Sequence, residues 1–288
     1  MGAGRLGTAL AIALAESGYR ISALVTRRRE HVLKAGALLD VFGVLLTSNK
    51  LNKLPPTDLV IIATPDDQIE LVARELSRIS SSHTKVRTVL HTSGALSSTI
   101  LSPLAELGWR TGSIHPLVAV SEPRSGAKAL RGAFWCIEGD KEAIRSAQRI
   151  VHDLKGQSFS LAAKHKPLYH AAAVMASGNM VALFDVALEM LGQCGLGAKE
   201  AHRVLLPLVE STIRNLSVSQ PARALTGTFA RGDLATVKRH LEALSASGIS
   251  DALELYRLLG KRAVALAREN GVEPKVLRKI TKALRGDS

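Results

Sequence analysis

The sequence has few aromatic residues, only two cysteines and no long apolar run, and each scarcity excludes a class of protein. Phe, Tyr and Trp make up 3% of the 288 residues, which leaves few rings on which nucleic-acid bases can stack. The cysteines, Cys136 and Cys194, are too few for a disulfide scaffold and lack the spacing of metal ligands. No uninterrupted apolar run reaches the ~18 residues of a membrane span. These features predict a soluble, cytoplasmic protein without a metal site.

The composition is apolar and basic at the same time. Hydrophobic residues make up 46% of the chain and the mean hydropathy is +0.13, which excludes a disordered protein. The 38 Lys and Arg residues outnumber the 25 Asp and Glu residues, so the formal net charge is +13. Such a charge indicates an anionic partner, which is a nucleic acid, a membrane surface or a phosphorylated small molecule.

β-rich and helical stretches alternate through the first half of the chain, which is typical of a doubly wound α/β sheet. Strands are expected at residues 19–25, 59–63, 87–91, 111–115 and 133–138. Helices are expected at residues 8–17, 30–41, 67–79, 98–107 and 141–154. Only helical patterns follow, at residues 167–192, 199–216, 234–245 and 250–270. We therefore predict an α/β domain at 1–162 and an all-helical domain at 163–288.

A glycine-rich motif opens the chain and leads directly into the first predicted helix. Gly2, Gly4 and Gly7 match GxGxxG, whose glycines allow a tight turn, a close approach to a pyrophosphate and close packing of helix on strand. Free N–H groups at the start of that helix would meet the phosphates, so Arg5 and Leu6 belong to the predicted cofactor site.

The end of the next predicted strand indicates which dinucleotide binds. An NAD site usually has Asp or Glu about 20 residues after the glycines, where it bonds the ribose hydroxyls. This sequence has Thr26, Arg27 and Arg28 there, and guanidinium groups can hold a 2′-phosphate by paired hydrogen bonds. The alternative is a solvated basic turn, but beside the glycine motif the arginines favour NADP(H).

The strand that precedes such a glycine motif is missing from the sequence. In a doubly wound sheet this strand is central, and without it two neighbouring strands lose a ladder partner. We therefore expect an apolar strand upstream of Met1, lost through a misassigned start or the boundary of an expressed fragment.

Polar residues follow three of the predicted strands, at the sheet edge where ligands bind. Those predicted to contact the cofactor are Ala63, Thr64, Pro65, Thr92 and Ser93. Those predicted to contact the substrate are Ser93, Gly94 and His115. The alternatives are an ordinary turn after residue 62 and a structural role for the histidine.

Four motifs together resemble a bacterial family. They are HTSGALSS at residues 91–98, SIHPL at 113–117, KPLYHAAAVMASGN at 166–179 and LTGTFARGD at 225–233. That family joins a Rossmann-like domain to a domain of unknown function, number 2520, and the resemblance extends over nearly the whole chain. The family is similar to pyrroline-carboxylate reductases, ketopantoate reductases and β-hydroxyacid dehydrogenases.

The resemblance implies NADP(H) binding and hydride transfer to a small substrate. It also implies a homodimer formed through a helical domain of the 6-phosphogluconate dehydrogenase C-terminal type. By similarity to pyrroline-carboxylate reductase, Ser177 and Asn179 lie on or beside a helix that admits the substrate. Thr226 and Thr228 resemble a loop that binds a substrate carboxylate.

Lys166 and His170 are the candidate proton donors. The β-hydroxyacid dehydrogenases have Lys and Asn four residues apart on this helix, so the histidine departs from their pattern. One helical turn separates the two residues, so they share a helix face, and imidazole has the better-matched ordinary pKa. The structural alternatives are a solvated lysine before the helix and a histidine packed between elements.

The sequence thus predicts an NADP-dependent oxidoreductase that transfers a hydride between NADPH and a small carbonyl or imine substrate. One alternative is an NADPH-binding sensor or scaffold without turnover. The other is a nucleic-acid-associated protein that uses the basic surface, although the chain contains no nucleic-acid motif.

Overall fold

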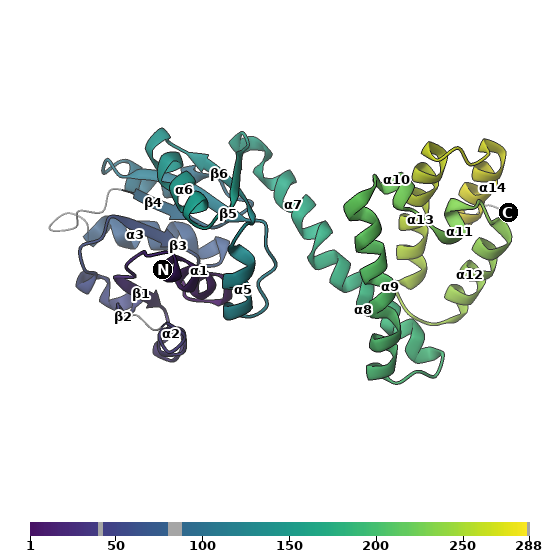
Figure 1. The fold of residues 1–288 in the computed structure, drawn as a ribbon, viewed down its shortest axis with the longest axis horizontal. Coiled ribbons are helices and arrows are strands. Elements are labelled where there is room, and N and C mark those ends of the chain that lie inside the picture. Colours follow the sequence, from purple (N-terminus) through teal and green to yellow (C-terminus); the bar gives the residue numbers. More distant parts are fainter. Residues whose placement is uncertain (40–42, 80–87, 287–288) are drawn as a thin grey trace. The chain divides into compact units, whose positions relative to one another are not determined.

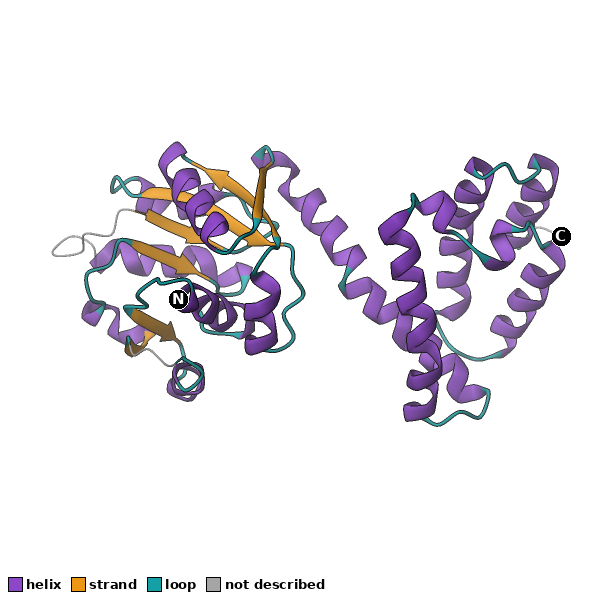
Figure 2. Cartoon of the chain, viewed as in Figure 1, coloured by secondary structure: helices purple, strands orange, loops and turns teal. Residues whose placement is uncertain are grey.

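The computed structural model describes residues 1–39, 43–79 and 88–286, which form two compact units (Figure 1). The first unit comprises Met1–Ser177 and the second begins at Gly178. Among the described residues, all strands belong to the first unit, and the second is helical (Figure 2). Helix α7 (Lys166–Ala176) therefore lies in the α/β unit, although its sequence pattern resembles that of the helices after it.

The first unit follows the predicted alternation of strands and helices. Its strands are β1 (Ala23–Thr26), β2 (Val44–Thr47), β3 (Leu59–Ile62), β4 (Thr88–His91), β5 (Arg110–Pro116), β6 (Phe134–Gly139) and β7 (Gln157–Ser160). Its α-helices before α7 are α1 (Arg5–Glu16), α2 (Arg29–Gly36), α3 (Asp66–Ile79), α4 (Ser102–Ala105), α5 (Pro123–Leu130) and α6 (Lys141–Asp153). Short 3-10 helices are η1 (Ser48–Lys53), η2 (Ser98–Leu101) and η3 (Ala163–His165).

The strands form two separate sheets. Strands β1 and β2 make a parallel pair, and the other five form a sheet in the order β3-β4-β5-β6-β7. Strands β3, β4 and β5 are parallel, whereas β6 runs antiparallel to β5 and parallel to β7. The predicted α/β class is confirmed, and the sheet is mixed rather than wholly parallel.

All five predicted strands are present, with shifted ends, but three elements have no clear sequence signal. Strand β7 exposes most of its side chains, β2 buries only one residue, and α5 contains both Pro123 and Gly126. The helix predicted at 98–107 is divided into η2 and α4. Asp40 and Val41 of the helix predicted at 30–41, and Arg87 of the strand predicted at 87–91, lie outside the described residues.

Helix α1 lies at the centre of the core of the first unit. Every residue from 8 to 14 is buried, and most are Ala or Leu, so the helix is apolar on nearly all sides. Helix α5 packs closely on it, because a Cβ on Gly126 would lie 3.2 Å from the Ala9 Cβ. This packing fixes the start of α1 and the glycine motif before it.

The second unit is helical, as predicted. Its helices are α8 (Gly178–Gln193), α9 (Ala198–Val218), α10 (Pro221–Ala224), α11 (Gly227–Ala230), α12 (Leu234–Ala246), α13 (Ala252–Glu269) and α14 (Pro274–Arg285). Asp233 caps α12, because its Oδ1 accepts a hydrogen bond of 3.0 Å from the Thr236 N–H. The main core of the unit is formed by Val237, Val264, Ala267, Leu277, Ile280 and Leu284.

The single helix expected at 167–192 is two helices. Ser177 has φ −124° and ψ −79°, which ends α7 before α8 begins. The whole stretch Ala163–Gln193 is long and apolar enough, by length and composition, to cross a membrane. This is weak evidence for a span, because α7 starts with a lysine buried in the α/β unit and α8 contains Asp185 and Glu189.

Candidate active site

The ends of β3, β4 and β5 bring three of the predicted segments to one edge of the sheet. Residues 63–65 follow β3, residues 92–94 follow β4, and His115 lies near the end of β5. The Thr92 N–H donates a hydrogen bond of 3.0 Å to the Ile62 carbonyl, which holds the first two segments side by side. Ligands of parallel sheets bind at this edge.

The glycine motif lies against the end of β3. Gly2 has φ +83°, and a Cβ on it would lie 2.7 Å from the carbonyl of Ala63 and the nitrogen of Thr64. Gly7 also has no room for a side chain, because its Cβ would contact the Gly2 carbonyl. In contrast, no described residue lies within 4 Å of a Cβ on Gly4, and none of the described side chains caps α1. The first N–H groups of α1 are therefore available to a phosphate.

A cavity of about 350 Å³ lies beside this motif. Its lining includes Gly2, Gly4, Thr26, Arg27, Arg28, His31, Thr64 and Pro65. The Thr64 Oγ1 is buried and has no hydrogen-bond partner among the described residues. Arg27 and Arg28 are exposed, and the Thr26 hydroxyl donates a hydrogen bond of 2.6 Å to the Arg28 carbonyl, which shapes their turn. These residues fit a dinucleotide cofactor.

Two residues of the motif have different surroundings. Arg5 is exposed at the start of α1, whereas Leu6 is half-buried and packs against the core. The Arg5 side chain is therefore free to contact a nucleotide, whereas the Leu6 side chain is not. Both residues have a backbone N–H in the first turn of the helix.

Helix α7 begins with a completely buried lysine. The Lys166 Nζ donates hydrogen bonds to the Ser113 Oγ at 2.5 Å and to the Ser93 carbonyl at 3.2 Å. Burial lowers the pKa of this ammonium group. The interpretation of Lys166 as a solvated residue is therefore wrong, because it ties the start of α7 to β5 and to the loop after β4.

Two imidazole rings and a phenol gather beside Gly94. The His115 Nδ1 lies 2.7 Å from the Tyr169 hydroxyl, and the rings of His115 and His170 meet edge to face with centroids 5.4 Å apart. A Cβ on Gly94 would lie 2.8 Å from the His115 Nε2 and would also contact the His170 Nδ1. The His170 Nδ1 is buried and has no hydrogen-bond partner among the described residues.

Burial and positive charge keep the histidines on these strands neutral. Burial, with smaller contributions from His170 and Lys166, lowers the pKa of His115 to about 4. Burial and the charge of Lys166 lower the pKa of His91 to about 3. Burial also raises the pKa of Tyr169, so its phenol keeps its proton at neutral pH. The cluster therefore contains neutral groups that can donate or accept hydrogen bonds.

The hydroxyl of Ser93 is engaged within its own loop. It donates a hydrogen bond of 2.8 Å to the Asp66 Oδ2 and accepts bonds from the N–H groups of Ala95 and Leu96 at 3.2 and 3.0 Å. These bonds hold Gly94 in position beside the two imidazole rings. Ser93 thus connects the segments that follow β3 and β4.

The other predicted substrate residues lie at or beyond the break at Ser177. Asn179 is in the first turn of α8, Thr226 is the residue before α11, and Thr228 is inside α11. These three belong to the second unit, and their contact with a substrate stays a prediction.

Sequence patterns do not single out three residues that contact the predicted site residues, namely Tyr169, Ser113 and Asp66. Tyr169 lies three residues after Lys166, so helical spacing would have placed it on the same face. Ser113 lies two residues before His115, and strand alternation points both side chains the same way. Asp66 carries no signal beyond its position at the start of α3.

Family models match both parts of the chain. A model of a Rossmann-like domain matches residues 1–116, and a model of the domain of unknown function DUF2520 matches residues 133–263. The resemblance carried by the four motifs is thereby confirmed. No curated protein matches the sequence.

Solved structures share the fold along nearly the whole chain. The protein TM1727 from Thermotoga maritima aligns with a TM-score of 0.71 at 22% identity, covering 94% of this chain and 98% of that one. A pyrroline carboxylate reductase from Plasmodium falciparum, with NADP bound, aligns at 0.55 and 14%, covering 100% and 95%. An imine reductase from Streptomyces aurantiacus aligns at 0.55 and 17%, covering 99% and 92%. At these identities the likeness shows the fold, which is one that oxidoreductases use.

Proposed function

We propose that this chain, a member of the family that joins a Rossmann-like domain to DUF2520, is an NADP-dependent oxidoreductase acting on a small carbonyl or imine compound. The proposal depends above all on the sheet edge of the first unit. There the glycine motif lies against the end of β3, and Gly94 lies in the segment that follows the neighbouring strand β4. A nucleotide site beside side chains that can donate a proton suits the reduction of C=O or C=N. The likeness to a pyrroline carboxylate reductase and an imine reductase supports this substrate class.

The residues that line the cavity beside the glycine motif favour NADP(H). The first N–H groups of α1 and the unpartnered hydroxyl of Thr64 would hold the phosphates, and Arg27 and Arg28 would hold the 2′-phosphate. Arg28 is also 3.8 Å from Glu30, but both side chains are exposed and such a pair is weak enough to exchange for a phosphate. When bound, NADPH would supply the hydride that reduces the substrate carbon.

We assign the proton donor to His170 and a positioning role to Lys166. Both hydrogen bonds that Lys166 makes are to groups of the protein, and the side chain is completely buried. His170 is half-buried, and one of its ring nitrogens has no hydrogen-bond partner in the part of the chain that the structure describes. As the substrate carbon gains the hydride, its oxygen or nitrogen would take one proton from the imidazolium form of His170, which leaves a neutral imidazole and an alcohol or an amine.

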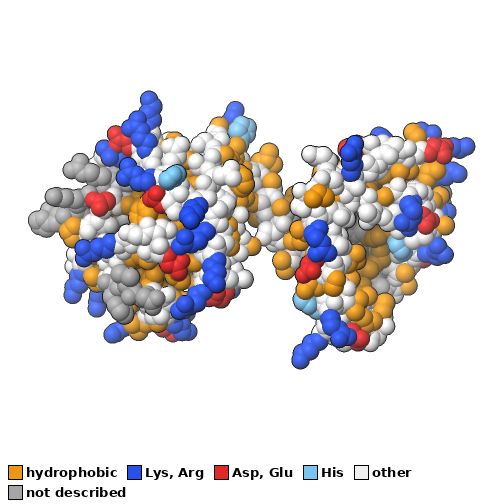
Figure 3. Space-filling view, in the orientation of Figure 1, with side chains coloured by type: hydrophobic (Ala, Val, Ile, Leu, Met, Phe, Trp, Pro, Cys, Tyr) orange, Lys and Arg blue, Asp and Glu red, His pale blue; other side chains and the backbone are white. Residues whose placement is uncertain are grey.

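We further propose that the second unit pairs with a second copy of the chain. None of the residues described in α8 is buried, and in α9 only Ala201 is. Exposed apolar side chains on these helices include Met180, Val181, Leu183, Val204, Leu208, Ile213 and Leu216. Hydrophobic side chains reach the surface of this unit (Figure 3). A face this apolar is typical of a protein interface. Val181→Glu with Leu208→Glu should halve the mass measured by light scattering, whereas an unchanged mass would exclude this face.

The distribution of charge supports a small-molecule partner over a nucleic acid. On the face shown in Figure 3, Lys and Arg side chains are spread over both units and interspersed with acidic ones. A nucleic-acid site would gather them along one groove or stripe. Helix α14 has basic residues in its last turn and buries Leu277, Ile280 and Leu284. This is the pattern of an amphipathic helix on the surface of a protein, so its basic residues do not require a nucleic-acid partner.

The decisive experiment separates binding from turnover. NADPH and NADH are titrated by fluorescence, and NADPH oxidation is then measured with a panel of cyclic imines and 2-keto acids. We expect tighter binding of NADPH and turnover of at least one compound, with turnover lost in His170→Gln. Tight binding without any turnover would identify a sensor, and preference for NADH would exclude the proposed cofactor.

A further inference from the structure

The side chains beside Gly94 form a row of hydrogen-bonding groups. The His170 Nδ1 and the His115 Nε2 face the same point, because a Cβ on Gly94 would lie 2.8 Å from the second nitrogen and would also contact the first. The other ring nitrogen of His115, Nδ1, lies 2.7 Å from the Tyr169 hydroxyl. The two nitrogens of the His115 ring therefore face different groups, an imidazole and a phenol.

The row ends at Cys136 of β6. The Tyr169 hydroxyl shares a hydrogen bond with the Cys136 side chain. This thiol is completely buried, and burial raises its pKa, so it keeps its proton at neutral pH. A phenol hydroxyl can accept one hydrogen bond and donate another, so Tyr169 can connect the imidazole of His115 to the sulfur.

The proton-donating form of His170 determines the direction of these hydrogen bonds. An imidazolium ring carries a hydrogen on both nitrogens, so the His170 Nδ1 then needs an acceptor. This nitrogen is buried and has no hydrogen-bond partner among the described residues, and the His115 Nε2 is the polar atom that faces it. A neutral His115 can accept at Nε2 only when its own hydrogen is on Nδ1. The Nδ1–H of His115 then donates to the Tyr169 oxygen.

His115 stays neutral beside a charged neighbour. Burial, followed by the charges of His170 and Lys166, lowers the pKa of His115 to about 4. The other titratable groups near the ring, Tyr169 and His91, are also neutral, because burial raises the pKa of the first and lowers that of the second. The acceptor that His170 meets is therefore an uncharged imidazole rather than a carboxylate.

We propose that His115 and Tyr169 are positioning residues, which hold His170 with a hydrogen on Nδ1 so that its Nε2 gives the proton to the substrate. The His170 Nδ1–H donates to the His115 Nε2, and the His115 Nδ1–H donates to the Tyr169 oxygen. The Tyr169 hydroxyl donates in turn to the Cys136 sulfur. As the Nε2–H bond of the imidazolium breaks and the O–H or N–H bond of the product forms, His170 becomes neutral and keeps its Nδ1 hydrogen. None of the bonds in the row has to reverse.

The role of the row in turnover rests on the proposed function, whereas the order of its hydrogen bonds does not. NMR of the chain labelled with ¹⁵N-histidine tests this order, because it distinguishes ring nitrogens that carry a hydrogen from those that do not. Spectra of His115→Gln and His170→Gln assign the two residues. We expect the hydrogen of His115 on Nδ1 at pH 7. Tyr169→Phe removes the acceptor of this hydrogen, which should then move to Nε2.

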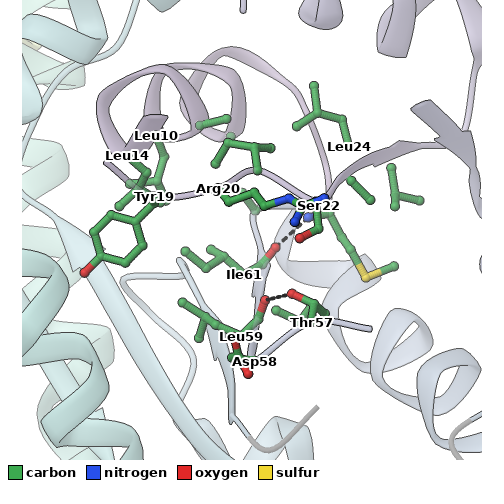
Figure 4. Close-up of a pocket in the computed structure, with 18 of the residues that line it drawn as sticks. Leu10, Leu14, Tyr19, Arg20, Ser22, Leu24, Thr57, Asp58, Leu59 and Ile61 are labelled. Carbon is green, nitrogen blue, oxygen red and sulfur yellow. Dashed lines mark hydrogen bonds between the residues drawn. The ribbon is translucent and has the colours of Figure 1, made fainter. Parts of the chain in front are cut away.

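Turnover tests the role of the row, with Tyr19→Phe as the matched control. The Tyr19 hydroxyl also donates a hydrogen bond, of 2.6 Å to the Asp153 Oδ2. Its ring lines a separate cavity of about 780 Å³, together with Leu10 and Leu14 of α1 (Figure 4). Tyr169→Phe should lower kcat by about tenfold, the equivalent of one hydrogen bond, and leave the Kd for NADPH unchanged. Tyr19→Phe should change neither.

Three results would overturn the proposal. The first is a hydrogen on the Nε2 of His115 in the unchanged chain, a measurement that does not depend on how any variant folds. The second is an unchanged tautomer of His115 in Tyr169→Phe. The third is an equal effect of Tyr169→Phe and Tyr19→Phe on kcat, which would assign the loss to stability alone. If no compound is turned over, the proposed function fails, and the NMR spectra still decide the order of the hydrogen bonds.

Discussion

Replacement of the two arginines at the end of β1 gives the sharpest test of the cofactor site. Arg27 and Arg28 line the cavity beside the glycine motif, and neither is buried. Arg29, the first residue of α2, is equally exposed and does not line that cavity. The double variant Arg27→Ser, Arg28→Ser therefore removes the proposed phosphate ligands, and Arg29→Ser is a matched control for the loss of charge.

The expected loss follows from the number and exposure of the hydrogen bonds. A hydrogen bond to a charged group contributes about 1.5–3 kcal/mol, and the exposure of both side chains favours the lower value. Two such contacts amount to about 3 kcal/mol, which corresponds to about 100-fold in Kd. NADH lacks the 2′-phosphate, so its Kd should change by no more than about threefold, through the loss of general attraction.

The assay is a fluorescence titration of NADPH and NADH against the chain and both variants, at two salt concentrations. We expect the NADPH preference to disappear in the double variant and to persist in Arg29→Ser. At higher salt the preference should decrease, because exposed charges are screened. Equal weakening of both cofactors, or the same loss in Arg29→Ser, would refute the assignment of Arg27 and Arg28 to the 2′-phosphate.

Three other variants or conditions test the remaining contacts. Lys166→Met removes the two hydrogen bonds of the Lys166 Nζ, so we expect α7 to be misplaced. Turnover should then fall by about 100-fold while the Kd for NADPH stays constant. An equal loss of NADPH binding would contradict a positioning role. Gly94→Ala adds a Cβ that would force apart the imidazole rings of His115 and His170, so it should lower both turnover and Tm. Gly192→Ala is the control and should lower neither, because no described residue lies within 4 Å of its Cβ. Unchanged kinetics in Gly94→Ala would argue against a role of the two histidines in turnover. The pKa of the Met1 amine falls from 8.0 to about 6 on folding, so the unfolded chain binds more protons between these values, and the free energy of unfolding should rise from pH 6 to pH 8 by up to about 3 kcal/mol. Denaturant titrations measure this rise, and N-terminal acetylation should remove it; a slope that survives acetylation belongs to another group.

Much of the α/β unit can be predicted from local sequence. The run at 59–63 is apolar throughout because its strand is covered on both faces, and Gly2 and Gly7 are required by contacts that any side chain would block. Strand β7 is different, because most of its side chains are exposed and it lies at the edge of the sheet. Such a strand shows neither alternation nor an apolar run, so no local pattern reveals it.

The candidate site is harder to predict, because its contacts join residues far apart in the chain. Lysine is almost never buried without partners, and the partners of Lys166 are 53 and 73 residues away. Nothing near residue 166 in the sequence indicates them. His115 and His170 are visible as candidates from their motifs, but their meeting beside Gly94 depends on where β5 and α7 are placed by the whole unit.

The two hydrogen bonds of the Lys166 Nζ also have a consequence for synthesis on the ribosome. Their acceptor groups belong to Ser93 and Ser113, which are made 73 and 53 residues earlier. At about 5–20 residues per second, these acceptors would remain solvated for roughly 3 to 15 s before the lysine is added. The edge of the first unit that holds the candidate site is therefore completed only as translation reaches the helices that lead into the second. A nascent chain that stalled before residue 166 would have a nearly finished sheet but not the final contact that closes its functional edge.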